Sequence, residues 1–297
     1  MRIAARLGAF AAVLVAAFAV AAAVGSATHA GQPASARQAP AHRPEGMSMS
    51  SPNQTMEHAG HTDALPGGLA VAAGGYRLES ADAVLAPGRA GRFAFRILGP
   101  DGQPVRAFSE EHGALLHLIV VRRDLKGFQH LHPTLDADGS WSTPLTLPSG
   151  GAYRAFVDFQ PRGAAAMTLG TDLLSPGDFQ PVALPAASPS AATDGYHVAL
   201  DAGSPRAGLA GELVFHVARD GRPVTALEPY LGARGHLVAL RQGDLAYLHV
   251  HPMDTHAQAN EIVFHALFPS PGAYRLFLQF KTAGHVHTAA YTLEVSR

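Results

Sequence analysis

The sequence contains no cysteine. No disulfide can therefore stabilise the fold, and no thiolate can act as a nucleophile or as a ligand of an iron–sulfur or blue-copper centre. Charged residues make up only 15% of the chain and the formal net charge is -1, so there is no basic field that could bind nucleic acid. The motifs of hydrolytic enzymes and of phosphate-binding loops are also missing. These absences argue against nucleic-acid binding and catalysis, and they restrict metal ligands to imidazole, carboxylate and thioether groups.

The first residues have the pattern of an export signal. Arg2 and Arg6 precede an apolar run from Leu7 to Val24, and small residues follow at Ala27 and Ala30. Residues 1–27 are therefore expected to be a signal peptide, or an uncleaved membrane anchor, because the run is just long enough for a spanning helix. Either outcome places the rest of the chain outside the cytoplasm, secreted or in the cell envelope, with the membrane contacted only through this segment.

Composition divides the rest of the chain into two modules. Residues 28–66 are rich in Ala, Pro, Ser, Gly, Met and His and poor in large aliphatic residues, so we expect a disordered Met/His-rich tail. A second Pro/Ala/Ser stretch, residues 185–194, has the composition of a linker. The modules then cover residues 67–184 and 195–297, each of ordinary domain size.

The two modules are copies of one sequence. Residues 101–133 align without a gap on residues 220–252 at a constant offset of 119, and about 13 of the 33 positions are identical. After a small change in length, Gly151-Ala-Tyr-Arg154 matches Gly272-Ala-Tyr-Arg275. A repeat of this length indicates that one fold occurs twice in tandem.

Short strands are expected throughout both copies. Runs such as Arg92–Ile97, Leu115–Val121 and Glu261–Leu267 are rich in β-forming residues and are bounded by turn residues. About seven such strands per hundred residues, without a capped helical stripe, predict an all-β chain of two tandem immunoglobulin-like antiparallel β-sandwiches. A Gly-x-Tyr-x-x-Phe pattern in each copy is typical of the tyrosine corner of such folds, a role that we assign to Tyr153 and Tyr274.

Histidines carry the clearest functional pattern, because most of the 17 in the chain are clustered. Each copy contains a His-x-His-Pro motif and a third histidine 13 residues upstream of it. Residues two apart in a strand project to the same side, and a hairpin would bring the third ring beside the pair. Three neutral imidazoles suit copper, zinc or nickel. The candidate ligands are His117, His130 and His132 in the first copy and His236, His249 and His251 in the second.

A structural interpretation of these motifs stays open. A histidine at a strand end can hydrogen-bond a backbone carbonyl, and the proline can simply end the strand. The metal hypothesis is favoured because all three positions recur in both copies while about 20 of the 33 aligned residues differ.

A further His-x-His pair, His285 and His287, lies near the start of the last expected strand, where the first copy has Ala164 and Ala166. The second module is therefore expected to be the richer one, with up to five imidazoles. The alternative is that exposed strand positions vary freely.

The tail adds soft ligands. It contains Met47, Met49, Met56, His58 and His61, so three of the six methionines lie where no core is expected. Thioether selects Cu(I), and imidazole accepts either copper oxidation state. The mixture favours copper, with zinc as the alternative.

Two segments resemble a known group of proteins. Leu116–Pro133 and Gly235–Pro252, with their His-x-His-Pro motifs, resemble those of secreted or membrane-anchored actinobacterial tandem β-sandwich proteins, over nearly the whole exported part. The resemblance implies handling of a heavy metal or copper. A more distant similarity is to periplasmic copper-resistance sandwich proteins, which also combine His with Met-rich segments. Copper–zinc superoxide dismutases share a sandwich with His-x-His on a strand, but their bridging histidine, disulfide and arginine pattern cannot be located here.

The leading hypothesis is therefore an extracytoplasmic protein that binds, sequesters or transfers copper, and whose partner besides the ion is a metal transporter or another envelope protein. The alternative is a non-catalytic envelope interaction module in which the histidines only brace loops. A weaker alternative is a copper-dependent redox enzyme, which superoxide turnover by the copper-loaded protein would test.

Overall fold

A computed structural model describes residues 65–253 and 257–297, with only the backbone of His249 and His251. The described residues form 20 strands and no helix. The strands of the first module are β1 (Ala72–Ala73), β2 (Tyr76–Ser80), β3 (Ala90–Leu98), β4 (Phe108–Ser109), β5 (Leu116–Arg122), β6 (Gln129–Leu131), β7 (Thr134–Leu135), β8 (Ser140–Thr146), β9 (Gly151–Pro161) and β10 (Met167–Ser175). Those of the second are β11 (Ser190–Thr193), β12 (Tyr196–Asp201), β13 (Ala210–Arg219), β14 (Arg222–Pro223), β15 (Gly235–Arg241), β16 (Tyr247–His249), β17 (His251–Met253), β18 (Glu261–Leu267), β19 (Gly272–Thr282) and β20 (His285–Val295).

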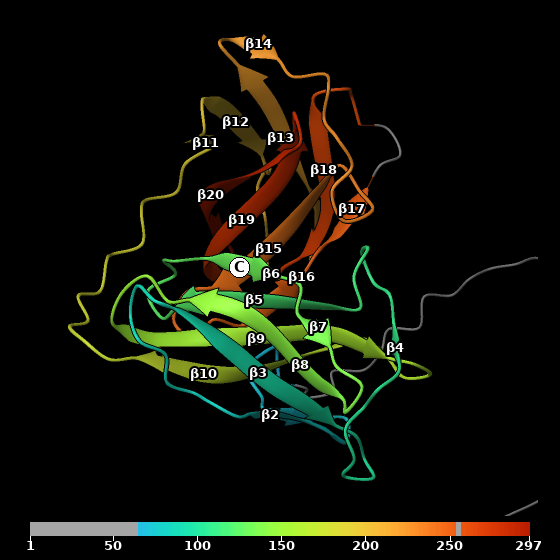
Figure 1. Cartoon of the computed structure of the whole chain (residues 1–297). Helices are drawn as coiled ribbons and strands as arrows, with labels where there is room; N and C mark the ends of the chain where they lie inside the picture. The colour runs from blue at the N-terminus through green and yellow to red at the C-terminus, as the bar shows by residue number, and fades with distance from the viewer. Residues whose placement is uncertain (1–64, 254–256) are drawn as a thin grey trace, which may run out of the picture. The chain divides into compact units, whose positions relative to one another are not determined.

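Each module is an immunoglobulin-like sandwich of two antiparallel sheets (Figure 1). In the first module the sheets have the orders β1-β2-β3-β8-β7 and β10-β9-β5-β6, and β4 pairs with β9. In the second module they have the orders β11-β12-β13-β18-β17 and β16-β15-β19-β20, and β14 pairs with β13. The prediction of two tandem immunoglobulin-like β-sandwiches is confirmed. β11 lies inside the stretch expected to be linker, and it pairs with β12.

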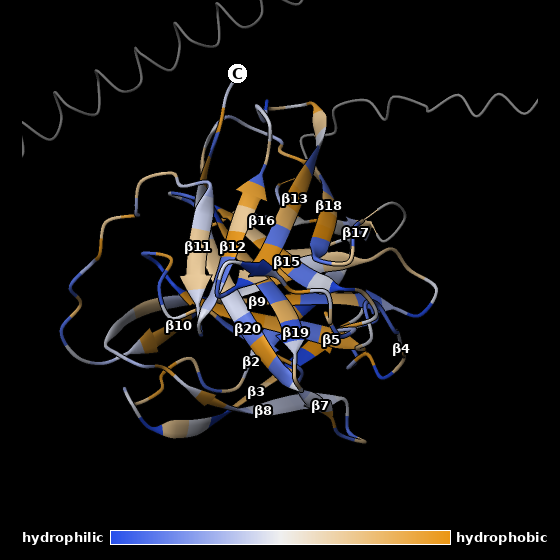
Figure 2. Ribbon diagram, turned by 90° about the horizontal axis from the view of Figure 1, so that it is seen from above, coloured by the Kyte–Doolittle hydropathy of each residue, from blue (hydrophilic) through white to orange (hydrophobic). Residues whose placement is uncertain are grey.

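Alternating burial explains why these segments form sandwich strands. In β3 the side chains of Phe93, Phe95 and Ile97 are buried while the intervening residues are more exposed, because successive side chains of a strand point to opposite faces. Figure 2 shows the same alternation as bands of high and low hydropathy along β13 and β18. Burial of one face against the partner sheet is therefore what stabilises each module in the absence of disulfides.

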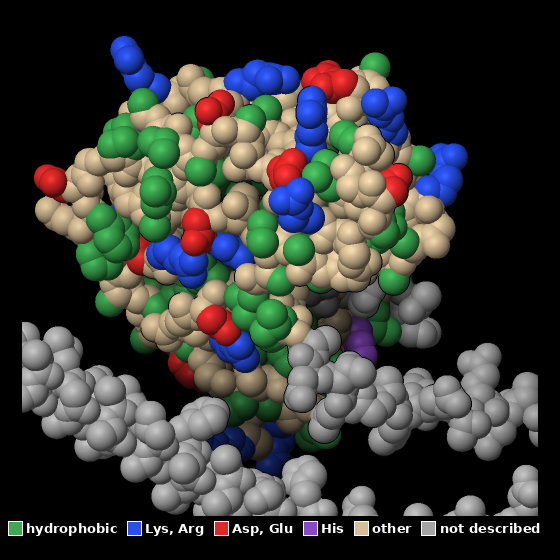
Figure 3. All heavy atoms as spheres, turned by 90° about the horizontal axis from the view of Figure 1, so that it is seen from below, with side chains coloured by type: hydrophobic (Ala, Val, Ile, Leu, Met, Phe, Trp, Pro, Cys, Tyr) green, Lys and Arg blue, Asp and Glu red, His purple; other side chains and the backbone are tan. Residues whose placement is uncertain are grey.

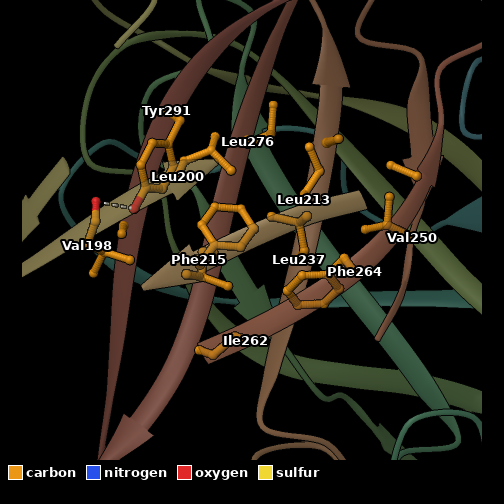
Figure 4. Packing of buried hydrophobic residues seen from close by; sticks show 14 of the residues in the cluster. Val198, Leu200, Leu213, Phe215, Leu237, Val250, Ile262, Phe264, Leu276 and Tyr291 are labelled. Carbon is orange, nitrogen blue, oxygen red and sulfur yellow. Dashed lines mark hydrogen bonds between the residues drawn. The ribbon is translucent and has the colours of Figure 1, made fainter. Parts of the chain in front are cut away.

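The core of the second module shows how the two sheets meet. Phe215 and Phe264 from one sheet pack edge-to-face, and Tyr291 from the other sheet packs against Phe215 with ring centroids 5.4 Å apart (Figure 4). The Tyr291 hydroxyl donates to the carbonyl of Val198 at 3.0 Å. The first module has a separate core around Trp141.

The tyrosine corners are confirmed in both modules. The Tyr153 hydroxyl donates to the carbonyl of Ser149 at 2.9 Å, and the Tyr274 hydroxyl donates to that of Ser270 at 3.0 Å. Both rings are 1% exposed or less, so each phenol ties a loop to a buried strand in the way that this corner does in other sandwiches.

A third apolar cluster joins the two modules. It is formed by the outer faces of β5 and β9 on one side and of β15 and β19 on the other, which lie close together in Figure 1. Phe128 of the first module stacks on Phe277 of the second at 4.1 Å, and Phe156 of the first packs on Tyr247 of the second at 5.5 Å. Tyr247 is the counterpart of Phe128 in the repeat, and Phe277 is that of Phe156. The crossed pairs give the contact an approximate two-fold symmetry.

Several sequence predictions fall on residues that the structure does not describe. The signal or anchor (residues 1–27) and most of the Met/His-rich tail (residues 28–66) are among them, since description begins at residue 65. Among the described residues no helix could span a bilayer.

Candidate metal centre

The first and fourth of the repeated histidines, His117 and His236, lie on equivalent central strands. On β5 the alternate residues Leu116 and Leu118 belong to the core of the first module, whereas Ile119 belongs to the cluster between the modules. His117 therefore shares the outer face with Ile119. The same parity on β15 places His236 on the outer face of the second module, and the two imidazoles stack with ring centroids 5.4 Å apart.

The His-x-His-Pro motif does not lie in a single strand, which corrects the sequence interpretation. In the first module β6 pairs with β5 and ends at Leu131, and β7 pairs with β8 in the other sheet. His130 is thus a strand residue opposite Ile119, and His132 lies in the crossing between the sheets. Convergence of the two rings comes from this crossing and not from strand periodicity; their centroids are 4.8 Å apart.

Three imidazole nitrogens of the first module meet at one point. His117 Nδ1 lies 3.0 Å from His130 Nε2 and 3.3 Å from His132 Nε2. The ring of His236 lies 4.5 Å from that of His130, and the ligand atoms of His117, His130 and His236 all lie within 4.8 Å of one another. Four of the residues expected as ligands are therefore brought together from both modules.

The other nitrogens of two of these rings contact oxygen acceptors. His117 Nε2 lies 2.9 Å from the carbonyl of Glu111, and His130 Nδ1 lies 2.6 Å from Gln279 Oε1. A carbonyl oxygen only accepts, so these nitrogens carry the protons and donate. In the neutral rings His117 Nδ1 and His130 Nε2 then present lone pairs toward each other. Outer oxygen partners that set the tautomer in this way are typical of metal-ligating histidines.

Burial favours the neutral form of His130 and His132. Desolvation lowers the pKa of His130 to about 3, partly opposed by the hydrogen bond to Gln279. Desolvation, followed by repulsion between the protonated forms of His132 and His117, lowers the pKa of His132 to about 4, although the His132 residue as a whole is exposed. His117 is 2% exposed and His236 is 9% exposed. His130 and His132 therefore offer unprotonated nitrogen ligands at neutral pH, and His132 connects the site with solvent.

Sequence reasoning missed three residues at this site. His112 gives no repeat signal, because the aligned position of the second copy is Leu231, yet its ring lies 6.3 Å from those of His117 and His236. Asp158 and Gln279 are the cross-strand partners of His117 and His236 on β9 and β19. Both are buried, at 8% and 7% exposure. The aligned repeat contains this signal, because the two polar residues occupy equivalent positions between apolar neighbours, Val157 and Phe159 in one copy and Leu278 and Phe280 in the other.

The second His-x-His-Pro motif follows the same backbone path. His249 ends β16 opposite Val238 of β15, as His130 lies opposite Ile119 of β5. His251 begins β17, in the other sheet, opposite His265. The side chains of His249 and His251 lie outside what the structure describes, so their role as ligands stays a prediction.

His285 and His287 do not join His236, and the expectation of five clustered imidazoles in the second module is wrong. His236 pairs with Gln279 on β19, whereas His287 pairs with Phe280, whose side chain faces the module core. Neighbouring residues of a strand face opposite ways, so these two histidines lie on the other face of the sheet. There His287 Nδ1 lies 2.8 Å from Asp194 Oδ2, and His285 is exposed.

The tail ligands Met47, Met49, Met56, His58 and His61 lie outside the described residues.

The face of the molecule in Figure 3 shows Lys and Arg interspersed with Asp and Glu. No large field of one sign appears on that face.

Fold and site together define a tandem immunoglobulin-like β-sandwich protein with a histidine cluster between its modules. The chain belongs to the family described as a domain of unknown function, DUF8832, which matches twice, at residues 70–170 and 191–297. A comparison with curated proteins finds no match.

Several solved structures share the sandwich fold at low similarity. The Escherichia coli adhesin FdeC is 17% identical, with 77% of this chain and 66% of that chain covered and a TM-score of 0.25. The Yersinia pseudotuberculosis adhesin InvE is 13% identical, with 74% of this chain and 59% of that chain covered and a TM-score of 0.22. The Ig1-2 module of the Drosophila receptor phosphatase DLAR is 6% identical, with 75% of this chain and 99% of that chain covered and a TM-score of 0.20. The chain spans less than two thirds of the length of either adhesin structure. These scores carry no argument about function.

Proposed function

We propose that this protein binds a transition-metal ion at the cluster of His117, His130, His132 and His236, and that it sequesters or passes on that ion outside the cytoplasm. The observation that carries the proposal is the convergence of His117 Nδ1, His130 Nε2 and His132 Nε2 at 3.0 and 3.3 Å. We use "histidine site" below for these four residues.

The spacing suits an ion better than it suits hydrogen bonds alone. Two nitrogens that bind one tetrahedral ion at about 2.0–2.1 Å lie about 3.3 Å apart. His117 Nδ1 faces both other nitrogens, and one ring nitrogen can share a proton well with only one of them. An ion would satisfy all three lone pairs together. The outer contacts to Glu111 and Gln279 already hold two of the rings in the required tautomer.

Copper is the proposed ion, and zinc is the alternative. Imidazole ligands fit both metals, and the Met/His composition of residues 28–66 favours copper because thioethers bind Cu(I). In this proposal the tail, whose imidazoles accept either copper oxidation state, captures the ion, and a metal transporter or another envelope protein receives it. The apolar N-terminal run supports export, and the resemblance to actinobacterial His-x-His-Pro sandwich proteins supports heavy-metal handling.

A second candidate is a non-catalytic envelope interaction module with structural histidines. The observation that favours it is the contact of His130 with Gln279 at 2.6 Å, which crosses from one module to the other. A hydrogen-bonded histidine network beside the apolar cluster would fix the modules relative to each other without an ion. A metal-free sample should then be as stable as a metal-loaded one.

Metal analysis of protein purified from the exported fraction tests the two candidates. We expect retained copper or zinc in the wild type, a higher melting temperature with metal than without, and imidazole nitrogen hyperfine structure in the Cu(II) electron paramagnetic resonance spectrum. The double variant His117→Ala/His130→Ala should lose the ion. His197→Ala, an exposed histidine on β12, is the matched control. Equal retention by the double variant and the control would favour the structural candidate.

The second His-x-His-Pro motif needs its own variant. His249→Ala/His251→Ala should also lower metal content if the motif of the second module supplies ligands. Unchanged content in that variant would confine the site to the four described histidines.

A further inference from the structure

Asp158 and Gln279 are equivalent residues with different charge. Asp158 is the Cα partner of His117, and Gln279 is the Cα partner of His236. Directly paired residues of antiparallel strands project to the same face, with Cβ atoms about 4.5–5.5 Å apart. Both residues therefore face the contact between the modules beside the histidine site, one with a carboxylate and the other with an amide.

Gln279 shows what a side chain at this position does. Its Oε1 accepts from His130 Nδ1 at 2.6 Å, so a residue of the second module contacts a histidine of the first. The aromatic contacts cross in the same manner, Phe128 with Phe277 and Phe156 with Tyr247. The approximate two-fold axis implies that Asp158 faces the second module near β16.

The electrostatic surroundings agree with that placement. Burial raises the pKa of Tyr247, on β16, and the negative charge of Asp158 raises it further. The same charge opposes the lowering of the His130 pKa. The carboxylate of Asp158 is therefore within electrostatic reach of both modules.

A hydrogen bond holds the Asp158 carboxylate in place, and Asp158 lines a cavity. Thr168 Oγ1 donates to Asp158 Oδ1 at 2.9 Å. A cavity of about 240 Å³ is lined by His117, Asp158, Met167 and Thr168, among others. The Asp158 residue is only 8% exposed, so its charge is screened by solvent less than that of a surface carboxylate.

We propose that Asp158 makes the histidine site selective for a divalent ion, Cu(II) or Zn(II), over the monovalent Cu(I). This inference rests on the proposed metal binding. The interaction of a fixed carboxylate with an ion is proportional to the charge of the ion, so Asp158 contributes about twice as much free energy for a divalent ion. Asp158 acts here as a specificity-determining residue through its charge, with the imidazoles as the ligands.

The test compares divalent and monovalent affinity in the full chain, by competition with chelators for Cu(II), Zn(II) and Cu(I). Asp158→Asn should lower the divalent affinities by about 10–100-fold, the range found for outer partners of a metal site. Cu(I) affinity should fall by only about 3–10-fold, the square root of that loss. Asp138→Asn, an exposed carboxylate on the loop before β8, is the matched control.

A second variant makes the test independent of whether Asp158→Asn folds. Gln279→Glu adds a carboxylate at the equivalent position and should raise the ratio of divalent to monovalent affinity. An unchanged ratio in Gln279→Glu, or in a folded Asp158→Asn, would overturn the inference. If His117→Ala/His130→Ala removes binding in the same assay, metal binding itself stands. If that double variant binds like the wild type, the proposed function fails as well.

Discussion

The two modules share their fold and their repeated histidines, but their surroundings differ. In the first module His117 pairs with Asp158, and in the second His236 pairs with Gln279. The buried arginines differ too: Arg154 donates to Asp172 at 3.0 Å, whereas its counterpart Arg275 donates to Thr292 at 3.2 Å. The backbone path, the tyrosine corner and the outer-face histidine are thus common to both copies. The carboxylates of Asp158 and Asp172 occur only in the first copy, where the second has Gln279 and Thr292. The differences are where a specific function is to be sought.

The aromatic contact between the modules offers the largest test of their equivalence. Phe156→Ala and Phe277→Ala each remove a buried ring from the joining cluster, where the exposures are 0% and 4%. We expect each variant to lose about 3–5 kcal/mol of unfolding free energy, measured by denaturant titration of metal-free protein. Similar losses would support the approximate two-fold symmetry. A loss in one variant several-fold larger than in the other would break the comparison.

The next largest effect separates the two histidine groups of the second module. His236→Ala should weaken metal binding by more than about 100-fold, because a ligand is worth more than an outer partner. His285→Ala/His287→Ala should change affinity by less than about twofold, since those residues lie on the opposite face of the sheet. Calorimetric titration of both variants measures the contrast. A large loss in the second variant would contradict the assigned faces.

These histidine groups also show how far the sequence could lead. The strands and the tyrosine corners followed from local pattern, because strand period and turn residues are properties of short segments, and the repeat followed from aligning the two halves of the chain. The face of His287 depends on the register between β19 and β20, which pairs it with Phe280. No local pattern encodes that register. The stacking of His117 on His236 was not predicted either, because a duplication indicates which residues are equivalent and not that they meet.

Acid should affect the first module through His130. The folded pKa of His130 is about 3, below the unfolded value of about 6.5. As pH falls below about 6.5 the unfolded chain binds the proton first, so stability is fully present above that pH and is lost progressively toward pH 3. Between pH 7 and pH 5 we expect the metal-free protein to lose up to about 2 kcal/mol through this residue.

The His130→Gln variant isolates that contribution. It keeps a polar side chain beside Gln279 but cannot titrate, so its loss between pH 7 and pH 5 should be smaller than that of the wild type by up to about 2 kcal/mol. Denaturant titrations at the two pH values provide the measurement. The acid sensitivity that persists in His130→Gln reports on His132 and on the second module. Identical pH profiles for variant and wild type would show that His130 is not buried neutral.

The tyrosine corners predict the smallest and most symmetric effect. Tyr153→Phe and Tyr274→Phe each remove one phenol that donates to a backbone carbonyl four residues upstream. A hydrogen bond of this kind contributes about 0.5–1.5 kcal/mol to stability, so we expect equal losses of about 1 kcal/mol in denaturant titrations. Tyr76→Phe is the control, because the Tyr76 ring packs on Phe159. This variant should lose less than about 0.5 kcal/mol of unfolding free energy.

In both corners the serine hydroxyl also lies beside the phenol and accepts a hydrogen bond from an arginine, Arg122 or Arg241. Equal losses would therefore mean that the whole corner, and not only its tyrosine, is conserved between the copies by the demands of the fold, in contrast to the charges beside the histidine site.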